Sequence, residues 1–312
     1  MTMGKTGQKR SNSQKRATRK RRSKKSNPPR FKGLLPSLAS LMVLGLVLAV
    51  IYLIPMPVRE EISSSAPVYE EFPSAPAEPS ATRPKPQRHT PVPTTPRVAI
   101  IIDDIGFHPT IDLAFAELDP HVSFAILPYA PHATSAAIRF NRSGHDILIH
   151  FPMEPFNGAL DPGPGVLTIS MGLNEMIKAI DKAVNKVPYA IGVNNHMGSK
   201  FTSDPKAMEL FLGVISSKGF FFIDSRTTAE TVAYETAQAM GIPSNQRSIF
   251  LDPKPDKKII HRQLQHLISI AEKNGQAIAI GHPYPETLEV LRRELPLLKK
   301  QVTIVPVHKI LH

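Results

Sequence analysis

The chain has 312 residues, of which 41% are apolar, and it carries a formal net charge of +12 without a single cysteine. The absence of cysteine excludes a disulfide framework and any thiolate metal site. Charge of this size usually suggests a nucleic acid or an anionic surface as partner, so its position along the chain matters.

The basic residues are concentrated at the start of the chain. The first 32 residues hold 13 Lys and Arg and no acidic residue, whereas the remaining 280 hold 25 basic and 26 acidic residues. This segment has too few apolar side chains to bury a core, and we predict that residues 1–33 form a disordered cytoplasmic tail. A nucleic-acid-binding tail is the alternative. We predict no nucleic-acid partner, because a tail beside a membrane helix, in contact with anionic lipid, explains the charge.

Residues 34–54 form an uncharged stretch of 21 residues. At about 1.5 Å per residue, a helix of this length crosses a hydrocarbon layer of about 30 Å. The positive charges before it and Arg59-Glu60-Glu61 after it place the N-terminus in the cytoplasm. A cleaved signal peptide is the alternative, but its apolar core usually has about 7–15 residues. We therefore predict a single-pass anchor in the inner (cytoplasmic) membrane, with the C-terminal domain periplasmic or extracellular.

Residues 55–96 contain 11 prolines. So many prolines prevent helices and strand pairing, and favour an extended, semi-rigid linker. We expect this linker to hold the domain that follows it at some distance from the membrane.

From residue 97 to residue 312, apolar runs alternate with amphipathic stretches. Leu173, Ile177 and Ile180 recur at helical spacing, Asp204-Pro205 is typical of a helix start, and Gly275 of a helix end. Strands alternating with helices predict an α/β domain with parallel strands, either a (β/α) barrel or a doubly wound sheet. The predicted strands are residues 98–102, 122–126, 147–149, 189–193, 220–223, 277–280 and 302–305, with a further short one at 249–251.

Polar residues follow these predicted strands. Because the carboxyl ends of parallel strands share one face, we expect the polar side chains to gather there. They are Asp103, Asp104, His150, Asn194, Asn195, His196, Asp224, Asp252 and His282. Asp and His without Cys suit zinc or another first-row divalent ion. Neighbours on an extended backbone point in different directions, so one carboxylate of Asp103-Asp104 can bind metal while the other acts as a base.

Several segments carry a resemblance to a known family. Ile-Ile-Ile-Asp-Asp-Ile-Gly at 100–106 resembles the first motif of the polysaccharide deacetylase superfamily, in which a strand ends in an aspartate pair. The segments 144–155, 192–199, 222–227 and 280–283 resemble, in the same order, the divergent polysaccharide deacetylase family. The resemblance covers residues 97–310. It implies a deformed (β/α) barrel with about seven parallel strands and metal-dependent removal of N- or O-acetyl groups from a sugar polymer.

The resemblance also implies roles for single residues. Asp103 matches the general base and Asp104 the aspartate that binds the metal. His150 matches the first histidine of the second motif. His282 matches the histidine that protonates the leaving group.

The sequence departs from the ordinary enzymes of the superfamily in two motifs. Their second histidine, four residues after the first, is Glu154 here, and their third-motif arginine gives way to Asn194-Asn195-His196. We predict that Asp104, His150 and His196 bind a divalent metal, with zinc favoured, and keep Glu154 as the alternative third ligand or a second acid or base. We expect substrate-binding or supporting roles for Glu154, Asn194, Asn195, Asp224 and Arg226.

The predicted function is a membrane-anchored, metal-dependent hydrolase that deacetylates a cell-envelope or extracellular polysaccharide, such as a peptidoglycan-type glycan. The first alternative is a catalytically inactive polysaccharide-binding or scaffold protein of the envelope. The second is a glycosidase that uses Asp103 and Glu154 and needs no metal. That second reading would leave the histidines without a role.

Overall fold

The computed structural model describes residues 95–312. The predicted tail, membrane helix and linker at 1–33, 34–54 and 55–96 lie outside these residues, apart from the linker's last two. Among residues 95–312, no helix is long and apolar enough to cross a membrane. The strands are β1 (Arg97–Ile105), β2 (Ser123–Ile126), β3 (Ile147–Met153), β4 (Gly192–Met197), β5 (Phe221–Asp224), β6 (Ser244–Gln246), β7 (Ile249–Phe250), β8 (Gln276–Gly281) and β9 (Thr303–Ile304). The helices are α2 (Pro109–Ala116), α3 (Ala133–Arg142), α4 (Leu173–Lys186), α5 (Pro205–Ser217), α6 (Ala233–Ala239), α7 (Lys257–Asn274) and α8 (Pro285–Leu298), with the 3₁₀ turn η1 (Val307–Lys309).

The strands form one curled parallel sheet, consistent with the predicted deformed barrel. Its order is β6-β5-β4-β3-β2-β1-β8-β7, and β9 pairs with the start of β1. Every strand pair is parallel. The two edge strands, β6 and β7, are separated in sequence only by Arg247 and Ser248, so the chain itself passes from one edge of the sheet to the other. The predicted parallel α/β architecture is therefore confirmed.

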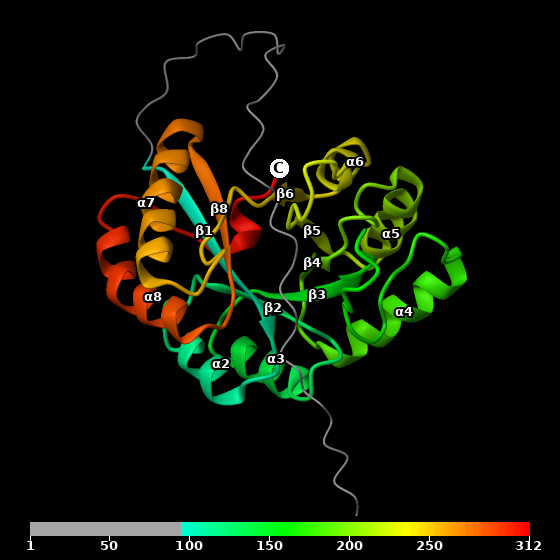
Figure 1. The fold of residues 1–312 in the computed structure, drawn as a ribbon, viewed down its shortest axis with the longest axis horizontal. Helices are drawn as coiled ribbons and strands as arrows, with labels where there is room; N and C mark the ends of the chain where they lie inside the picture. The colour runs from blue at the N-terminus through cyan, green and yellow to red at the C-terminus, as the bar shows by residue number, and fades with distance from the viewer. Residues whose placement is uncertain (1–94) are drawn as a thin grey trace, which may run out of the picture. The chain divides into compact units, whose positions relative to one another are not determined.

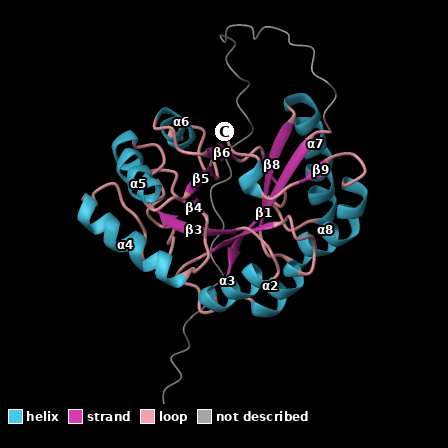
Figure 2. Cartoon of the chain, turned by 180° about the vertical axis from the view of Figure 1, so that it is seen from behind, coloured by secondary structure: helices cyan, strands magenta, loops and turns pink. Residues whose placement is uncertain are grey.

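The helices cover the outer side of this sheet. In Figures 1 and 2, α4 and α5 lie outside β3 to β5, while α7 and α8 lie beside β8 and β1. Two predicted boundaries are confirmed. Asp204 caps α5 by accepting a 2.8 Å hydrogen bond from the Ala207 N–H, and Gly275 ends α7 in the left-handed conformation with φ 81°.

Apolar side chains pack on both sides of the strands, as expected for a parallel sheet covered by helices. The outer core joins the sheet to the helices and includes Val98, Ile100 and Ile102 of β1. A smaller inner core fills the concave side. Its members include Ala99 and Ile101 of β1, and Val307 and Ile310 from the C-terminal segment. The alternation along β1 thus assigns odd-numbered residues to the interior, which decides where Asp103 lies.

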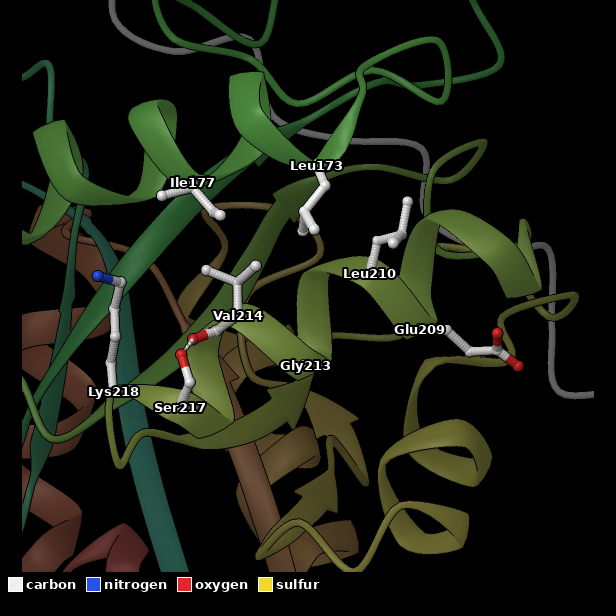
Figure 3. Close-up of a pocket in the computed structure, with 8 residues that line it drawn as sticks. All are labelled: Leu173, Ile177, Glu209, Leu210, Gly213, Val214, Ser217 and Lys218. Carbon is white, nitrogen blue, oxygen red and sulfur yellow. Dashed lines mark hydrogen bonds between the residues drawn. The ribbon is translucent and has the colours of Figure 1, made fainter.

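One predicted strand boundary is wrong. β4 begins at Gly192 rather than at 189, because Tyr189 has φ 67° and cannot continue an extended strand. Leu173 begins α4, as its helical spacing with Ile177 and Ile180 predicts, and is 46% exposed. It lies with Ile177 against Leu210 and Val214 of α5, along a groove of about 390 Å³ (Figure 3). None of the predicted site residues lines this groove.

Candidate metal and catalytic site

The site lies at the carboxyl ends of the central strands. Residues two apart on a strand share a face, so Asp103, His150 and His282 continue rows of the inner core. Ile101 precedes Asp103, Leu148 precedes His150, and Ile280 precedes His282 in this way. The prediction that polar residues follow the strands needs correction for β1, β3 and β4. Asp103, Asp104, His150 and the 194–196 segment are inside them, since these strands run further than their apolar runs.

Asp103 and Asp104 do not point apart as the regular alternation predicts. Asp104 has φ 56°, in the left-handed region, so the extended geometry is interrupted just after Asp103. As a result both carboxylates approach the same imidazole. His150 Nε2 lies 3.6 Å from an Asp103 oxygen and 3.2 Å from Asp104 Oδ1. Both aspartates are only 2% exposed.

Three possible metal ligands converge at Asp104. Its Oδ1 lies 3.2 Å from His150 Nε2 and 3.1 Å from His196 Nδ1, and the two histidine nitrogens are 3.2 Å apart. This is a group that could hold a metal ion within the described part of the chain. Metal bonds of about 2.0–2.1 Å in tetrahedral geometry separate ligand atoms by about 3.3 Å, so the spacing suits zinc.

The chemistry of these atoms also fits a cation. Both Asp104 oxygens are buried, and no N–H or O–H within residues 95–312 donates a well-oriented hydrogen bond to them. A carboxylate left in this state is costly unless a cation accompanies it. Burial raises the pKa of Asp104, but His196 and His150 outweigh burial and hold that pKa well below its ordinary value. Asp104 is therefore ionised, as a metal ligand must be.

Asp103 has different surroundings. Burial raises its pKa above the ordinary value, and this effect outweighs the opposing charges of His150 and His282. Asn194 donates hydrogen bonds of 2.9 and 3.0 Å to its two oxygens. Two adjacent carboxylates thus differ in protonation tendency, which allows one to bind metal and the other to exchange a proton.

His282 is held by Asp252, a residue to which sequence reasoning assigned no role. His282 Nδ1 lies 2.8 Å from Asp252 Oδ1, and Asp252 Oδ2 accepts hydrogen bonds from the His282 N–H and Thr287 Oγ1. Burial lowers the pKa of His282, but Asp252, Asp104 and Asp103 outweigh burial and raise it to about 9. The sequence feature that could have indicated a role for Asp252 is its position directly after the short apolar run at 249–251.

Glu154 lies outside the cluster. Lys200 donates a 2.5 Å hydrogen bond to its Oε1 and the Ile169 N–H a 2.9 Å hydrogen bond to its Oε2, and the side chain is 24% exposed. Both oxygens of Glu154 are therefore used to hold the loop that follows β3. The structure gives no support to the alternative in which Glu154 is the third ligand.

Three of the predicted supporting residues stabilise the β4–β6 region instead of reaching the cluster. Asn195 donates to the Met197 carbonyl and accepts from the Ser225 N–H. Asp224 accepts from the Arg226 N–H and from Thr231 Oγ1, while the Arg226 guanidinium donates to Gln246. Of the predicted supporting residues, Asn194 is the one with hydrogen bonds to both Asp103 and His150.

The curled parallel sheet and the acidic and imidazole groups at its carboxyl ends define a deacetylase-like α/β fold. The chain belongs to the divergent polysaccharide deacetylase family, whose sequence profile matches residues 100–311. The resemblance found in the sequence is thereby confirmed.

Relatives from three bacteria are similar to this chain. The uncharacterized protein YibQ of Escherichia coli (strain K12) is 37% identical over 219 residues, which is 69% of this chain and 67% of YibQ. An uncharacterized protein of Haemophilus influenzae is 39% identical over 209 residues, or 67% of this chain and 74% of the relative. Among solved structures, the uncharacterized protein ATU2773 of Agrobacterium tumefaciens matches with a TM-score of 0.67 and 26% identity, covering 72% of this chain and 92% of the other.

Proposed function

We propose that this protein is a metal-dependent hydrolase that removes acetyl groups from a cell-envelope or extracellular polysaccharide. The observation that carries the proposal is the convergence of Asp104, His150 and His196 within 3.1–3.2 Å of one another. Family membership supports the class of substrate, since the family is described as divergent polysaccharide deacetylases.

The three residues offer the ligand set that a catalytic zinc needs, in which water or substrate takes the fourth position. When bound, the metal would supply Lewis-acid polarisation of the acyl oxygen and make water easier to deprotonate. The protein's own groups account for the proton transfers. Asp103, whose pKa burial raises, takes a proton from the attacking water. That water adds to the acyl carbon, the bond to the sugar nitrogen or oxygen breaks, and acetate is released.

His282 supplies the proton for the leaving group. Its pKa of about 9 means that the ring is protonated at neutral pH. Asp252 is hydrogen-bonded to Nδ1, and in the proposed reaction Nε2–H delivers the proton to the departing amine or alkoxide. The Asp252–His282 pair therefore works as an oriented general acid.

The test measures metal content and acetate release together in the full-length protein. We expect stoichiometric divalent metal in the unaltered protein and its loss in the double variant Asp104→Ala, His150→Ala. Asp103→Asn should keep the metal while acetate release from acetylated glycans falls about 100- to 10,000-fold, the usual effect of losing a general base. Asp181→Asn, which alters the ion pair between Asp181 of α4 and Lys218 at the end of α5, is the matched control.

Two results would overturn the proposal. A native protein that takes up no divalent metal excludes the metal-dependent reaction. A protein that binds metal and glycan but releases no acetate is a glycan-binding scaffold that has lost the reaction.

We further propose that residues 34–54 anchor the protein in the inner membrane and that the catalytic domain faces away from the cytoplasm. The support is the uncharged 21-residue stretch and the 13 basic residues on its N-terminal side. Such an anchor would place the site beside the envelope glycans.

A further inference from the structure

Asn194 lies between the two halves of the site. It is fully buried in β4, directly opposite His150 in the register of β3 with β4. Its Oδ1 lies 2.9 Å from His150 Nδ1, and its Nδ2 lies 2.9 and 3.0 Å from the two oxygens of Asp103. Ser225 Oγ accepts a longer hydrogen bond of 3.3 Å from the same Nδ2. One amide thus contacts both the proposed base and a proposed metal ligand.

Chemistry fixes which way this amide points. An ionised carboxylate only accepts hydrogen bonds, so the group facing Asp103 must be the donating Nδ2. Oδ1 then faces His150 and accepts from Nδ1–H. With its proton on Nδ1, neutral His150 presents the lone pair of Nε2 to Asp104 and His196, as metal binding requires.

We infer that Asn194 is a positioning residue that sets the tautomer of His150 for metal binding and, with the other end of the same amide, orients the carboxylate of Asp103. This inference rests on the proposed function and extends it to a residue outside the ligand set. Only a group with a donor and an acceptor on one rigid plane meets both needs. A carboxylate at this position lacks the donor, and an alkyl group lacks both.

Two substitutions separate the halves of this role. Asn194→Leu has a similar volume and makes neither contact. We expect the zinc affinity of the full-length protein, measured by competition with a chromophoric chelator, to fall about 10- to 100-fold, as for the loss of other groups that orient a ligand. Asn194→Asp can still accept from His150 Nδ1–H, so zinc affinity should not weaken. Its charge repels Asp103, however, so acetate release at saturating zinc should fall.

The neighbouring Asn195 provides the matched control. It is equally buried in the same strand, but its amide connects the Met197 carbonyl to the Ser225 N–H. Asn195→Leu should lower the melting temperature and leave the zinc affinity of the folded protein unchanged. If Asn194 had only a structural role, Asn194→Leu would likewise lower the melting temperature and leave zinc affinity unchanged.

The outcomes distinguish this inference from the proposed function. If the unaltered protein binds zinc and Asn194→Leu binds it equally tightly, the inference is overturned and the proposed function stands. Equal losses of zinc affinity in Asn194→Leu and Asn194→Asp would also overturn it, because the acceptor would then have no effect. If the unaltered protein binds no zinc or other divalent metal, the proposed function fails, and the inference fails with it.

Discussion

At the scale of single residues, backbone strain coincides with the site. Three non-glycine residues with positive φ lie at or near strand ends close to it: Asp104 in β1, Met197 in β4 and Arg226 after β5. A left-handed non-glycine residue costs about 1–2 kcal/mol, less for Asp than for most others. At Asp104 this conformation is what brings a second carboxylate to His150. The strained backbone at Asp104 therefore lies where the proposed metal ligands come together.

Asp112, an aspartate near the site, should make the stability of the folded protein depend on pH. Asp112 of α2 is 3% exposed and accepts a 3.0 Å hydrogen bond from the Gly106 N–H, next to the aspartate pair. Burial raises its pKa from 3.8 to about 6, against the opposing hydrogen bonds from Gly106 and His108. The folded state therefore holds this proton more tightly than the unfolded state, and stability decreases as the pH rises through this window.

We predict that Asp112→Asn stabilises the protein above pH 7, because an amide accepts the Gly106 hydrogen bond without carrying a buried charge. A shift of this size corresponds to at most about 3 kcal/mol. Urea unfolding of both proteins between pH 4 and pH 8 measures the effect. The difference should shrink toward pH 4, where the aspartate is protonated in the folded state and about half protonated in the unfolded state. A difference that stays constant over this range would contradict the assignment.

At the scale of secondary structure, capping residues made two boundaries predictable. Asp204 and Pro205 indicated the start of α5, and Gly275 the end of α7, because their preferences depend only on the local backbone. β6 was missed, since Ser244–Gln246 has three residues and no apolar pattern. The ligand residues were recognisable from their position near strand ends. The role of Asn194 was not, because it depends on the pairing of Asn194 with His150, and register between distant segments cannot be derived from local patterns.

The α5 cap allows a direct test. Replacing Asp204 by Ala removes the acceptor of the Ala207 N–H and should cost about 1 kcal/mol of stability. Asp204→Ser, which keeps an acceptor, should restore most of it. Both values follow from denaturant midpoints of the purified protein. Equal losses in the two variants would mean that the side-chain cap contributes nothing.

At the scale of the whole molecule, charge is divided between two parts of the chain. The basic residues of 1–32 account for the net +12, and the rest of the chain is nearly neutral. We predict that a protease added to spheroplasts digests residues 97–312 while a cytoplasmic marker protein stays intact. The reason is the positive-inside orientation of residues 34–54. Protection of the domain until the cells are lysed would reverse the proposed topology.

The C-terminal segment has a further consequence. Val307 and Ile310 fill the inner core, and His312 exchanges backbone hydrogen bonds of 3.2 and 3.0 Å with Ser244. The C-terminal segment therefore fills the concave side of the sheet at the end opposite the aspartates. A polymer cannot pass through the sheet's interior. In the proposed reaction a glycan strand would have to lie across the carboxyl ends of the strands instead of passing through the sheet's interior. Sugars in the middle of a long strand would then be as reachable as those at its tips.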